Sequence, residues 1–365
     1  MSTLKVEITT VDAVHVHPNA DKLEIVQVKG WMCVVGKDQY KTGDKCVYIP
    51  IDSILPMEVE AQIFGIDSKI KLNKSRVKTI KIRKAISQGL VVHPDTLALN
   101  ALPVGSDVTV QLGITKYEPP AIGNSNTGYG NVKKSLKTNP NFNKYTDIEN
   151  FKWYDRVFQP GEPVVAHEKI HGTNFRCGWV LAVADTFFKK LKKLFGMLPK
   201  YEFVYGSRNV QLQNRIFWNG YYDTNVYSKI VDQYNLREVL KPGQVIYGEV
   251  YGVGIQGGYT YGCAEGEHKL AIFDLMVDGK YQDYSQLDEF LKETNLPRVP
   301  VLYEGPYDLA LIKPLIDGDS VLAPTQKVRE GLVLRPIQEQ VCIAGRKILK
   351  LISDEYLLGD QTEFH

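Results

Sequence analysis

A polar stretch rich in proline and glycine, residues 116–150, divides the 365-residue chain into two segments of different character. The stretch has little periodicity, so we expect a linker between two domains. In residues 1–115, short β-branched runs alternate with turn residues, which predicts an all-β unit closed into a small barrel. The predicted strands are 4–10, 23–29, 45–51 and 76–82.

Residues 151–365 show a mixed α and β pattern, which predicts an α+β domain. The pair Asp278-Gly279 has the signature of a tight hairpin. One helix is expected to begin with Ser285 as its N-cap and Asp288 at the third helical position. The expected helices are 185–198, 223–240 and 285–294, and the expected strands are 164–168, 201–206, 244–251, 270–277, 331–335 and 348–352.

The overall composition excludes several classes of protein. The chain is 44% hydrophobic and 24% charged, which is ordinary for a globular protein. No apolar run reaches the roughly 18 residues of a membrane helix, and the charged N-terminal segment does not resemble a secretory signal. The five cysteines are scattered, without zinc-site spacing or a disulfide framework. We therefore predict an intracellular protein, cytoplasmic or nuclear, with no membrane partner.

The octet Glu168–Phe175, EKIHGTNF, carries the strongest indication of chemistry. An apolar strand leads into Lys169, and Gly172 allows the backbone to turn tightly and approach a ligand. A bare lysine followed three residues later by glycine is common by chance, and would then be a surface lysine in a turn. The complete octet, however, closely resembles the nucleotidyltransferase signature of RNA ligases. His171 supports this interpretation, since DNA ligases and mRNA capping enzymes usually carry aspartate at that position.

The resemblance implies a covalent lysyl-AMP at Lys169 and a nucleotide pocket formed by its neighbours. These neighbours are Glu168, Ile170, Gly172 and Asn174.

Five later segments resemble the remaining motifs of this family, in the family's order. The resemblance implies that Arg208 contacts phosphate or ribose, and that Glu249 holds ribose or a metal-bound water. It places Phe273 against adenine, Glu330 at the metal and Lys350 on the α-phosphate. Each residue alone has an ordinary structural explanation, such as a salt bridge or a core position. Five in the expected order favour the family.

The closing motif departs from the family pattern. The family usually has two lysines separated by one residue, whereas Ile352 follows Lys350 at that distance. Lys347 is a weaker candidate for the second lysine, because on a regular strand it would face away from Lys350.

The N-terminal segment also carries a resemblance. His17–Leu23, HPNADKL, is similar to the opening of tRNA-binding OB-fold modules. An OB barrel followed by a nucleotidyltransferase domain resembles the nick-sealing RNA ligases with that domain order, found in some bacteria and single-celled eukaryotes. The barrel includes the basic segment 67–84, from which we expect Lys78, Lys81 and Arg83 to bind RNA phosphates.

The reaction that the resemblance implies has three steps. Lys169 attacks the α-phosphorus of ATP, AMP passes to an RNA 5′-phosphate, and a 3′-hydroxyl displaces AMP. Lysine ordinarily has a pKa of about 10.4. Nearby Mg²⁺ or Mn²⁺, and the cation of Lys350, would favour the neutral nucleophilic amine. Glu249 and Glu330 would hold the metal, because magnesium prefers oxygen ligands. The expected partner is RNA with 3′-hydroxyl and 5′-phosphate ends, in duplex or nicked form.

Two other functions fit parts of the sequence. A DNA ligase or mRNA guanylyltransferase would share the lysine chemistry, but His171 argues against it. A non-catalytic tRNA-binding or RNA-binding OB protein would explain residues 17–23, but not the ordered motifs between 168 and 350. The residues do not distinguish a duplex nick, a broken tRNA loop and a single strand as substrate. They indicate no obligate protein partner.

Overall fold

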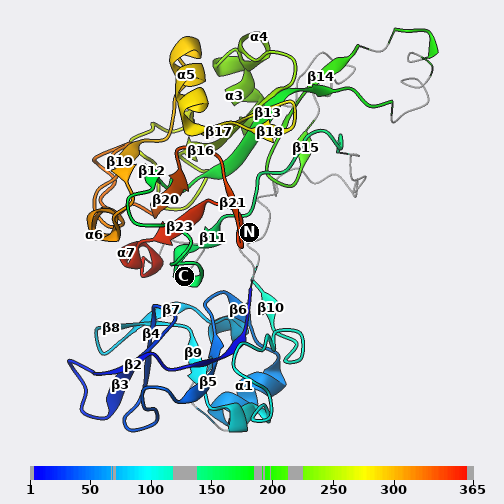
Figure 1. Cartoon of the computed structure of the whole chain (residues 1–365). Helices are drawn as coiled ribbons and strands as arrows, with labels where there is room; N and C mark the ends of the chain where they lie inside the picture. The colour runs from blue at the N-terminus through cyan, green and yellow to red at the C-terminus, as the bar shows by residue number, and fades with distance from the viewer. Residues whose placement is uncertain are drawn as a thin grey trace. The chain divides into compact units, whose positions relative to one another are not determined.

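The computed structural model describes residues 4–66, 68, 71–117, 138–184, 191, 194–197, 199–212 and 225–359 (Figure 1). Contacts divide the chain into two compact units. The first contains the described part of residues 1–124 together with 149–155 and 354–359. The second contains residues 138–148 and the described part of 156–353.

The first unit contains mostly short strands. They are β1 (Glu7–Thr10), β2 (Ala13–Val16), β3 (Leu23–Val28), β4 (Trp31–Gly36), β5 (Lys45–Ile49), β6 (Ser53–Ile54), β7 (Thr79–Ile82), β8 (Ala85–Gln88), β9 (Leu90–Val92), β10 (Thr115–Lys116) and β11 (Glu149–Asn150). The helices are α1 (Met57–Phe64), α7 (Asp354–Leu357) and the 3-10 helices η1 (Asn73–Ser75), η2 (Pro94–Leu97) and η3 (Phe151–Trp153).

These strands pair antiparallel into small sheets with the orders β1-β5-β9 and β2-β3-β4, and β7 with β8 forms a hairpin. Strand β5 is central to the core, because its side chains point alternately into two apolar clusters. Val47 and Ile49 enter one cluster, and Cys46 and Tyr48 enter the other. The ring of Trp153, from η3, lies 5.8 Å from that of Tyr48. The predicted all-β barrel is confirmed, and each of the four predicted runs contains an observed strand.

The second unit combines long strands with short helices. Its strands are β12 (Pro163–Glu168), β13 (Thr173–Leu181), β14 (Tyr201–Gly206), β15 (Gln211–Leu212), β16 (Gln244–Gly252), β17 (His268–Val277), β18 (Lys280–Tyr281), β19 (Val301–Pro306), β20 (Gly331–Pro336), β21 (Val341–Cys342), β22 (Gly345–Arg346) and β23 (Leu349–Ile352). Its helices include α3 (Val226–Gln233), α4 (Leu236–Val239), α5 (Tyr284–Thr294), α6 (Leu309–Ile312) and the 3-10 helix η4 (Lys313–Leu315).

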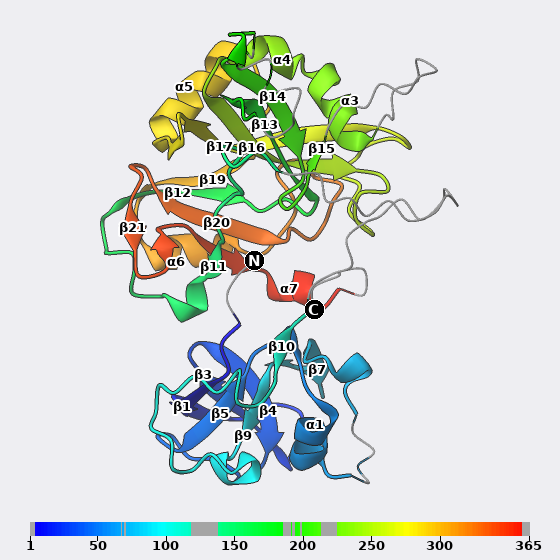
Figure 2. The same ribbon diagram turned by 90° about the vertical axis from the view of Figure 1, so that its right-hand side faces the viewer.

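Two antiparallel sheets form the body of this unit (Figure 2). The larger has the order β15-β14-β13-β16-β17-β18, and the strands β23-β20-β12-β19 lie in the other. Alternation along β13 separates the faces of the larger sheet. Phe175 and Cys177 are buried in one cluster with apolar residues of α3, α4 and α5. Asn174 and Arg176 therefore point to the opposite face, where Tyr247 and Val333 join residues of both sheets in another cluster.

Two local expectations in this unit need correction, and one strand was not predicted. Helix α5 begins after Asp283, which forms a capping box with Gln286, so Ser285 is not the N-cap. The described part of the expected helix 223–240 is two helices, because Asn235 between them adopts a left-handed conformation with φ of 48°. The patterns read from the sequence also omit β13, although it is a nine-residue strand at the centre of the larger sheet.

The hairpin predicted at Asp278-Gly279 is confirmed, since both residues have positive φ and join β17 to β18. Most of the expected helix 185–198, and residues 118–137 of the expected linker, lie outside the described residues. Among the helices that the structure describes, none is long and apolar enough to cross a membrane.

Candidate active site

Lys169 follows β12 in a turn that two glycines make possible. Strand β12 lies between β19 and β20, and the Lys169 amide donates to the carbonyl of Gly331 at 2.9 Å. Gly331 has φ of 139°, and a Cβ there would lie 2.1 Å from the carbonyl oxygen of Leu351. At Gly172 a Cβ would lie 2.3 Å from the carbonyl oxygen of Val250. Because side chains do not fit at these positions, glycine lets the strands approach closely around the turn.

The side chain of Lys169 lies in a group of polar residues from several strands. Its Nζ is 2.7 Å from Oε1 of Glu330, the residue before β20. Glu249, on β16, is the register partner of Asn174 on β13, and its charge acts on Lys169. His171 Nδ1 lies 3.8 Å from the other carboxylate oxygen of Glu330. We call Lys169, Glu249 and Glu330, with Asn174 and His171, the lysine pocket.

The carboxylates dominate the electrostatics of the lysine pocket. Burial by itself lowers the pKa of Lys169, but Glu330 and Glu249 outweigh it, so this pKa lies above its ordinary value. Burial, reinforced by the charge of Glu330, raises the pKa of Glu249 to about 8. Burial lowers the pKa of His171. Without a further cation, Lys169 is therefore protonated, and the neutral nucleophile expected from the sequence requires a change in this charge balance.

Buried oxygen atoms mark the same cluster. Neither Glu330 Oε2 nor Asn174 Oδ1 has a hydrogen-bond partner among the residues that the structure describes. Buried acceptors are costly unless something satisfies them. The described part of the chain has no group of three or more His, Cys, Asp or Glu side chains that could hold a metal. Magnesium, however, commonly uses one or two carboxylates together with substrate phosphates, so this oxygen-rich donor set fits it.

Two residues predicted to line the nucleotide pocket, Glu168 and Ile170, are buried within the protein. The Glu168 carboxylate accepts hydrogen bonds from the hydroxyl of Ser320 and from the amides of Val321 and Leu322, at 2.8 and 3.2 Å for the amides. Ile170 is 4% exposed. Glu168 thus fixes the loop that precedes β20, and its contact with a nucleotide stays a prediction.

The basic residues of the later motifs lie in different surroundings. Arg208, just after β14, forms an ion pair with Asp147, and burial lowers the pKa of Arg208. Lys350 is half-exposed on β23, opposite Val333 of β20. Contact of Arg208 and Lys350 with a nucleotide stays a prediction.

Lys347 is engaged outside the lysine pocket. Its Nζ lies 2.6 Å from Glu162 Oε1, donates to Gln340 and sits 5.2 Å from the centroid of the Phe158 ring. These contacts give the ammonium a structural role, and a contact of Lys347 with a nucleotide stays a prediction.

Phe273, on β17, is half-buried against an anchored aromatic residue. Its ring centroid lies 4.9 Å from that of Tyr145, edge to face. The Tyr145 hydroxyl donates to Asp274 at 2.8 Å. Phe273 also packs in the same apolar cluster as Val333 and Ile148. The aromatic side chain predicted to meet adenine is thus packed against protein on one side.

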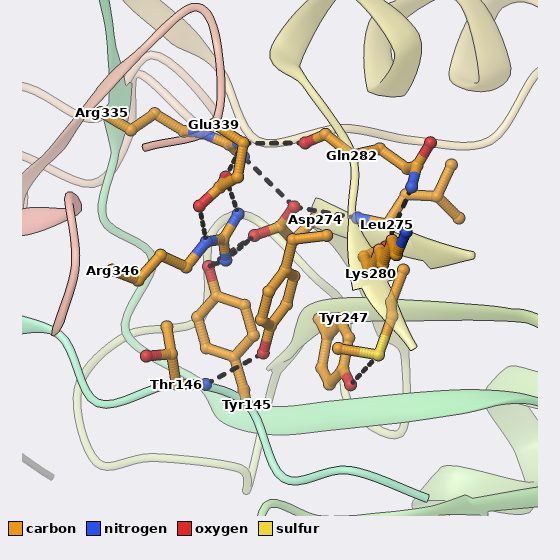
Figure 3. Close-up of polar contacts among 12 residues, drawn as sticks. Tyr145, Thr146, Tyr247, Asp274, Leu275, Lys280, Gln282, Arg335, Glu339 and Arg346 are labelled. Carbon is orange, nitrogen blue, oxygen red and sulfur yellow. Dashed lines mark hydrogen bonds and ion pairs between the residues drawn. The ribbon is translucent and has the colours of Figure 1, made fainter. Parts of the chain in front are cut away.

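Asp274 has no exposed surface and binds two guanidinium groups (Figure 3). Arg335 donates to its Oδ1 and Arg346 to its Oδ2, and both arginines also donate to Glu339. Burial alone raises the pKa of Asp274, but the two arginines outweigh it, so this pKa lies below its ordinary value. We call Asp274, Arg335, Glu339 and Arg346 the Asp274 network. The network links β20 and β22 to β17, the strand that also carries Phe273.

Motif patterns missed several polar residues around the lysine pocket. The hydroxyls of Tyr227, on α3, and Thr173 share a hydrogen bond of 2.9 Å. The hydroxyl of Tyr261 accepts a hydrogen bond from the amide of His171, and Gln256 donates to the turn as well. Tyr227, Gln256 and Tyr261 belong to no recognised motif, whereas Thr173 lies in the octet 168–175. The density of tyrosine and glycine just after β16 was the only signal in the sequence.

In the first unit, the β7-β8 hairpin carries exposed cations. Lys81, Arg83 and Lys84 are exposed, and the last two form its two-residue turn with positive φ. Lys78, just before β7, is half-buried, and burial lowers its pKa. Arg76 is buried in an ion pair of 2.6 Å with Asp52, so it does not contribute to this exposed basic surface.

Comparison with known proteins agrees with these two units. A family model described as an OB-fold domain matches residues 5–94, and one described as RNA ligase matches residues 162–352. No curated protein sequence matches the chain. The fold and the lysine pocket define a nucleotidyltransferase-type ligase joined to an OB domain. Since the RNA ligase model covers more than half of the chain, the protein belongs to the RNA ligase family.

Several solved structures are similar over nearly the whole chain. An RNA ligase from Naegleria gruberi with pyrophosphate has 24% identity and a TM-score of 0.72, covering 97% of this chain and 98% of that one. A lysine-to-alanine mutant of that ligase with ATP and manganese has 23% identity and a TM-score of 0.71, covering 96% and 98%. A lysine-to-methionine mutant with AMP and manganese has 24% identity and a TM-score of 0.72, covering 96% and 97%. At this identity the likeness establishes the shared fold.

Proposed function

We propose that this protein is an ATP-dependent RNA ligase that seals 3′-hydroxyl and 5′-phosphate ends through a lysyl-AMP at Lys169. The observation that carries the proposal is the Lys169 ammonium 2.7 Å from Glu330 and within the field of Glu249, in a turn set by Gly172 and Gly331. Such a half-buried lysine among carboxylates is typical of a site with perturbed protonation.

The proposed first step forms one bond and breaks one bond. Neutral Lys169 Nζ attacks the α-phosphorus of ATP, a phosphorus–nitrogen bond forms, and the bond to the leaving pyrophosphate oxygen breaks. The ammonium must first lose its proton to solvent, which bound positive charge near the pocket would favour. Glu249 and Glu330 would hold a Mg²⁺ or Mn²⁺ ion, which supplies positive charge near the α-phosphate.

Two further steps complete sealing. An oxygen of the RNA 5′-phosphate displaces Lys169 from the AMP phosphorus, which gives an RNA-adenylate. The 3′-hydroxyl of the other end then attacks the 5′-phosphorus, loses its proton and releases AMP. Both transfers use the same pocket, because the activated phosphate stays next to the adenylate.

The nucleotide would extend from the lysine pocket towards Phe273. Phe273 and Val333 come from facing sheets and share one apolar cluster, which suits the two faces of a purine. Lys350, opposite Val333, would reach the α-phosphate, and Arg208 the phosphate or ribose. The Naegleria gruberi ligase structures with ATP or AMP and manganese support this choice of ligands for the shared fold.

The OB domain would bind the RNA backbone next to the break. Lys81, Arg83 and the neighbouring Lys84 are exposed on one hairpin, with Lys78 at its base. Single-strand-binding OB folds usually stack bases on aromatic side chains, but in the described part of the first unit every aromatic residue is buried or half-buried. With these rings packed against protein, phosphate contacts would carry most of the binding, which suits a duplex such as a nicked substrate.

Labelling with ATP tests the proposed enzyme class. The wild-type protein, incubated with α-labelled ATP and magnesium, should retain label on a denaturing gel, and GTP should not substitute. Lys169→Met should retain none, yet should still seal RNA that is already adenylylated, since that step needs no new lysyl bond. Labelling from GTP would favour a guanylyltransferase, and no labelling in wild type would favour a non-catalytic RNA-binding protein.

A salt series tests the RNA surface. Replacing Lys78, Lys81 and Arg83 together by alanine should weaken binding to nicked RNA. The slope of log affinity against log salt should fall by about 0.9 for each phosphate that the hairpin no longer neutralises. The matched control replaces Lys241, Lys292 and Lys327, exposed lysines of the second unit, with the same change in net charge. Equal slopes in the two variants would make the hairpin an ordinary solvated surface.

A further inference from the structure

The loop between β16 and β17, residues 253–267, contacts the turn after Lys169 at several points. The hydroxyl of Tyr261 accepts a hydrogen bond of 2.8 Å from the amide of His171. Nε2 of Gln256 donates to the carbonyl of Gly172 at 3.2 Å. The ring of Tyr259 meets that of His171 edge to face, with centroids 4.8 Å apart. The loop therefore holds both a donor and an acceptor of the turn's backbone.

These hydrogen bonds fall where the strands do not hold the chain. Strand β12 ends at Glu168 and β13 begins at Thr173, so the residues between them belong to the pairing register of neither strand. At one end of the turn, the Lys169 amide is held by Gly331. At the other, the polar backbone groups of His171 and Gly172 are held by side chains of the loop. Buried backbone groups need such partners.

Within this loop, Tyr261 has an unusual backbone conformation. Tyr261 is 4% exposed and has φ of 50°, in the left-handed region. A large side chain adopts that conformation only where its surroundings determine it, and such residues cluster at functional sites. Tyr251 supplies part of these surroundings, with its ring edge to face against Tyr261 at 5.3 Å. The position of the Tyr261 hydroxyl is thus fixed by packing as well as by its hydrogen bond.

We propose that Tyr261 and Gln256 are positioning residues that hold Lys169 in line for attack on the nucleotide. They act through the backbone of His171 and Gly172, and they need not touch substrate themselves. Displacement of a reacting group by about 1 Å can cost up to about 100-fold in rate. The inference rests on the proposed role of Lys169, since it concerns the orientation of that side chain towards the α-phosphorus.

Two substitutions in the full-length protein separate positioning from stability. Tyr261→Phe removes the hydroxyl and keeps the ring, and Gln256→Leu removes the donor from a half-exposed side chain. Each should slow single-turnover adenylylation at saturating ATP by about tenfold. The ATP concentration for half-saturation should stay close to wild type. The Tm should fall only slightly, because each variant loses a single hydrogen bond. Sealing of RNA that is already adenylylated should also continue near the wild-type rate, because that reaction does not require Lys169 as a nucleophile.

Tyr251→Phe is the matched control, because it is the same substitution in a ring that packs against Tyr261. It should leave adenylylation unchanged. The proposal would be overturned by wild-type adenylylation in both test variants, by an equal loss in the control, or by an equal loss of sealing on adenylylated RNA. Those outcomes leave the role of Lys169 intact if wild-type protein is labelled by ATP. Absence of that label would instead refute the proposed function itself.

Discussion

The lysine pocket and the Asp274 network both place charges inside the second unit, yet they differ in balance. In the Asp274 network, two carboxylates meet two guanidinium groups, and each Asp274 oxygen accepts hydrogen bonds. In the lysine pocket, the ammonium of Lys169 faces two carboxylates, and buried oxygens of Glu330 and Asn174 lack hydrogen-bond partners among the described residues.

This difference separates stability from function. A satisfied and neutral group of buried charges holds elements in place, and removing one member leaves another charge uncompensated. An unsatisfied group is costly in the free protein and becomes favourable when ligands complete it. We therefore expect substitutions in the Asp274 network to unfold the protein, and substitutions in the lysine pocket to stop the reaction.

The largest expected effect is on stability, at Asp274. Asp274→Asn should lower the free energy of unfolding by about 3–5 kcal/mol, because it leaves two buried guanidinium groups with less negative charge. Denaturant unfolding measures this loss. Asp288→Asn is the control, since Asp288 also binds two cations, Lys292 and Arg298, but at the surface. The control should lose at most about 1 kcal/mol. Similar losses in both variants would remove the distinction drawn for the buried network.

Glu330→Gln should show the opposite pattern. Adenylylation should fall by about 100-fold or more, because charge placed for the transition state is lost. The free energy of unfolding should change by less than about 1 kcal/mol, because Lys169 retains Glu249 and the two carboxylates no longer repel each other. Single-turnover labelling and denaturant unfolding of one preparation provide both values. A large loss of stability with normal labelling would reverse the comparison.

Phe273 packs against Tyr145 beside the Asp274 network and is proposed to meet adenine, so graded substitutions show which role it serves. Phe273→Leu should mainly raise the ATP concentration needed for half-maximal labelling, because apolar contact is partly retained. Phe273→Ala should raise it further, in line with about 1–3 kcal/mol for a base stacked on an aromatic ring. A titration with ATP and a thermal melt distinguish the roles. Equal loss of Tm in both variants, with normal use of ATP, would assign Phe273 to the core.

The last prediction concerns a change of stability with pH. The pKa of Glu249 is about 8 in the folded protein and 4.5 ordinarily, so the folded state binds more protons between these values. The stability that this adds is present below about pH 4.5 and is lost as pH rises through about 8. Metal-free wild type should therefore lose Tm relative to Glu249→Gln between pH 5 and pH 8, and magnesium should reduce that loss. A constant difference would show that Glu249 is not perturbed.

The sequence was most informative where chemistry requires a particular residue. Lys169, Glu249 and Glu330 lie far apart in the chain, and the resemblance of their motifs brought them together before the fold was known. Strand periodicity likewise located β14 with both of its ends. Such features depend on local pattern or on motifs that tolerate little change.

What the sequence did not reveal depends on tertiary contacts. The hydrogen bonds that Ser320 and two amides donate to the Glu168 carboxylate follow from no local pattern. Lys347 pairs with Glu162, which lies in a distant part of the chain. Tyr261 belongs to no motif, and its importance lies in a hydrogen bond across the fold. No local pattern encodes partners of this kind.

Locating the covalent AMP tests the central claim most directly. Wild-type protein would be incubated with ATP and magnesium, digested, and analysed by peptide mass spectrometry. We predict that one AMP is attached to the peptide that contains Lys169, through the lysine side chain, and that Lys169→Met carries none. AMP on another lysine, or persistent labelling of Lys169→Met, would contradict the assignment of the lysine pocket as the active site.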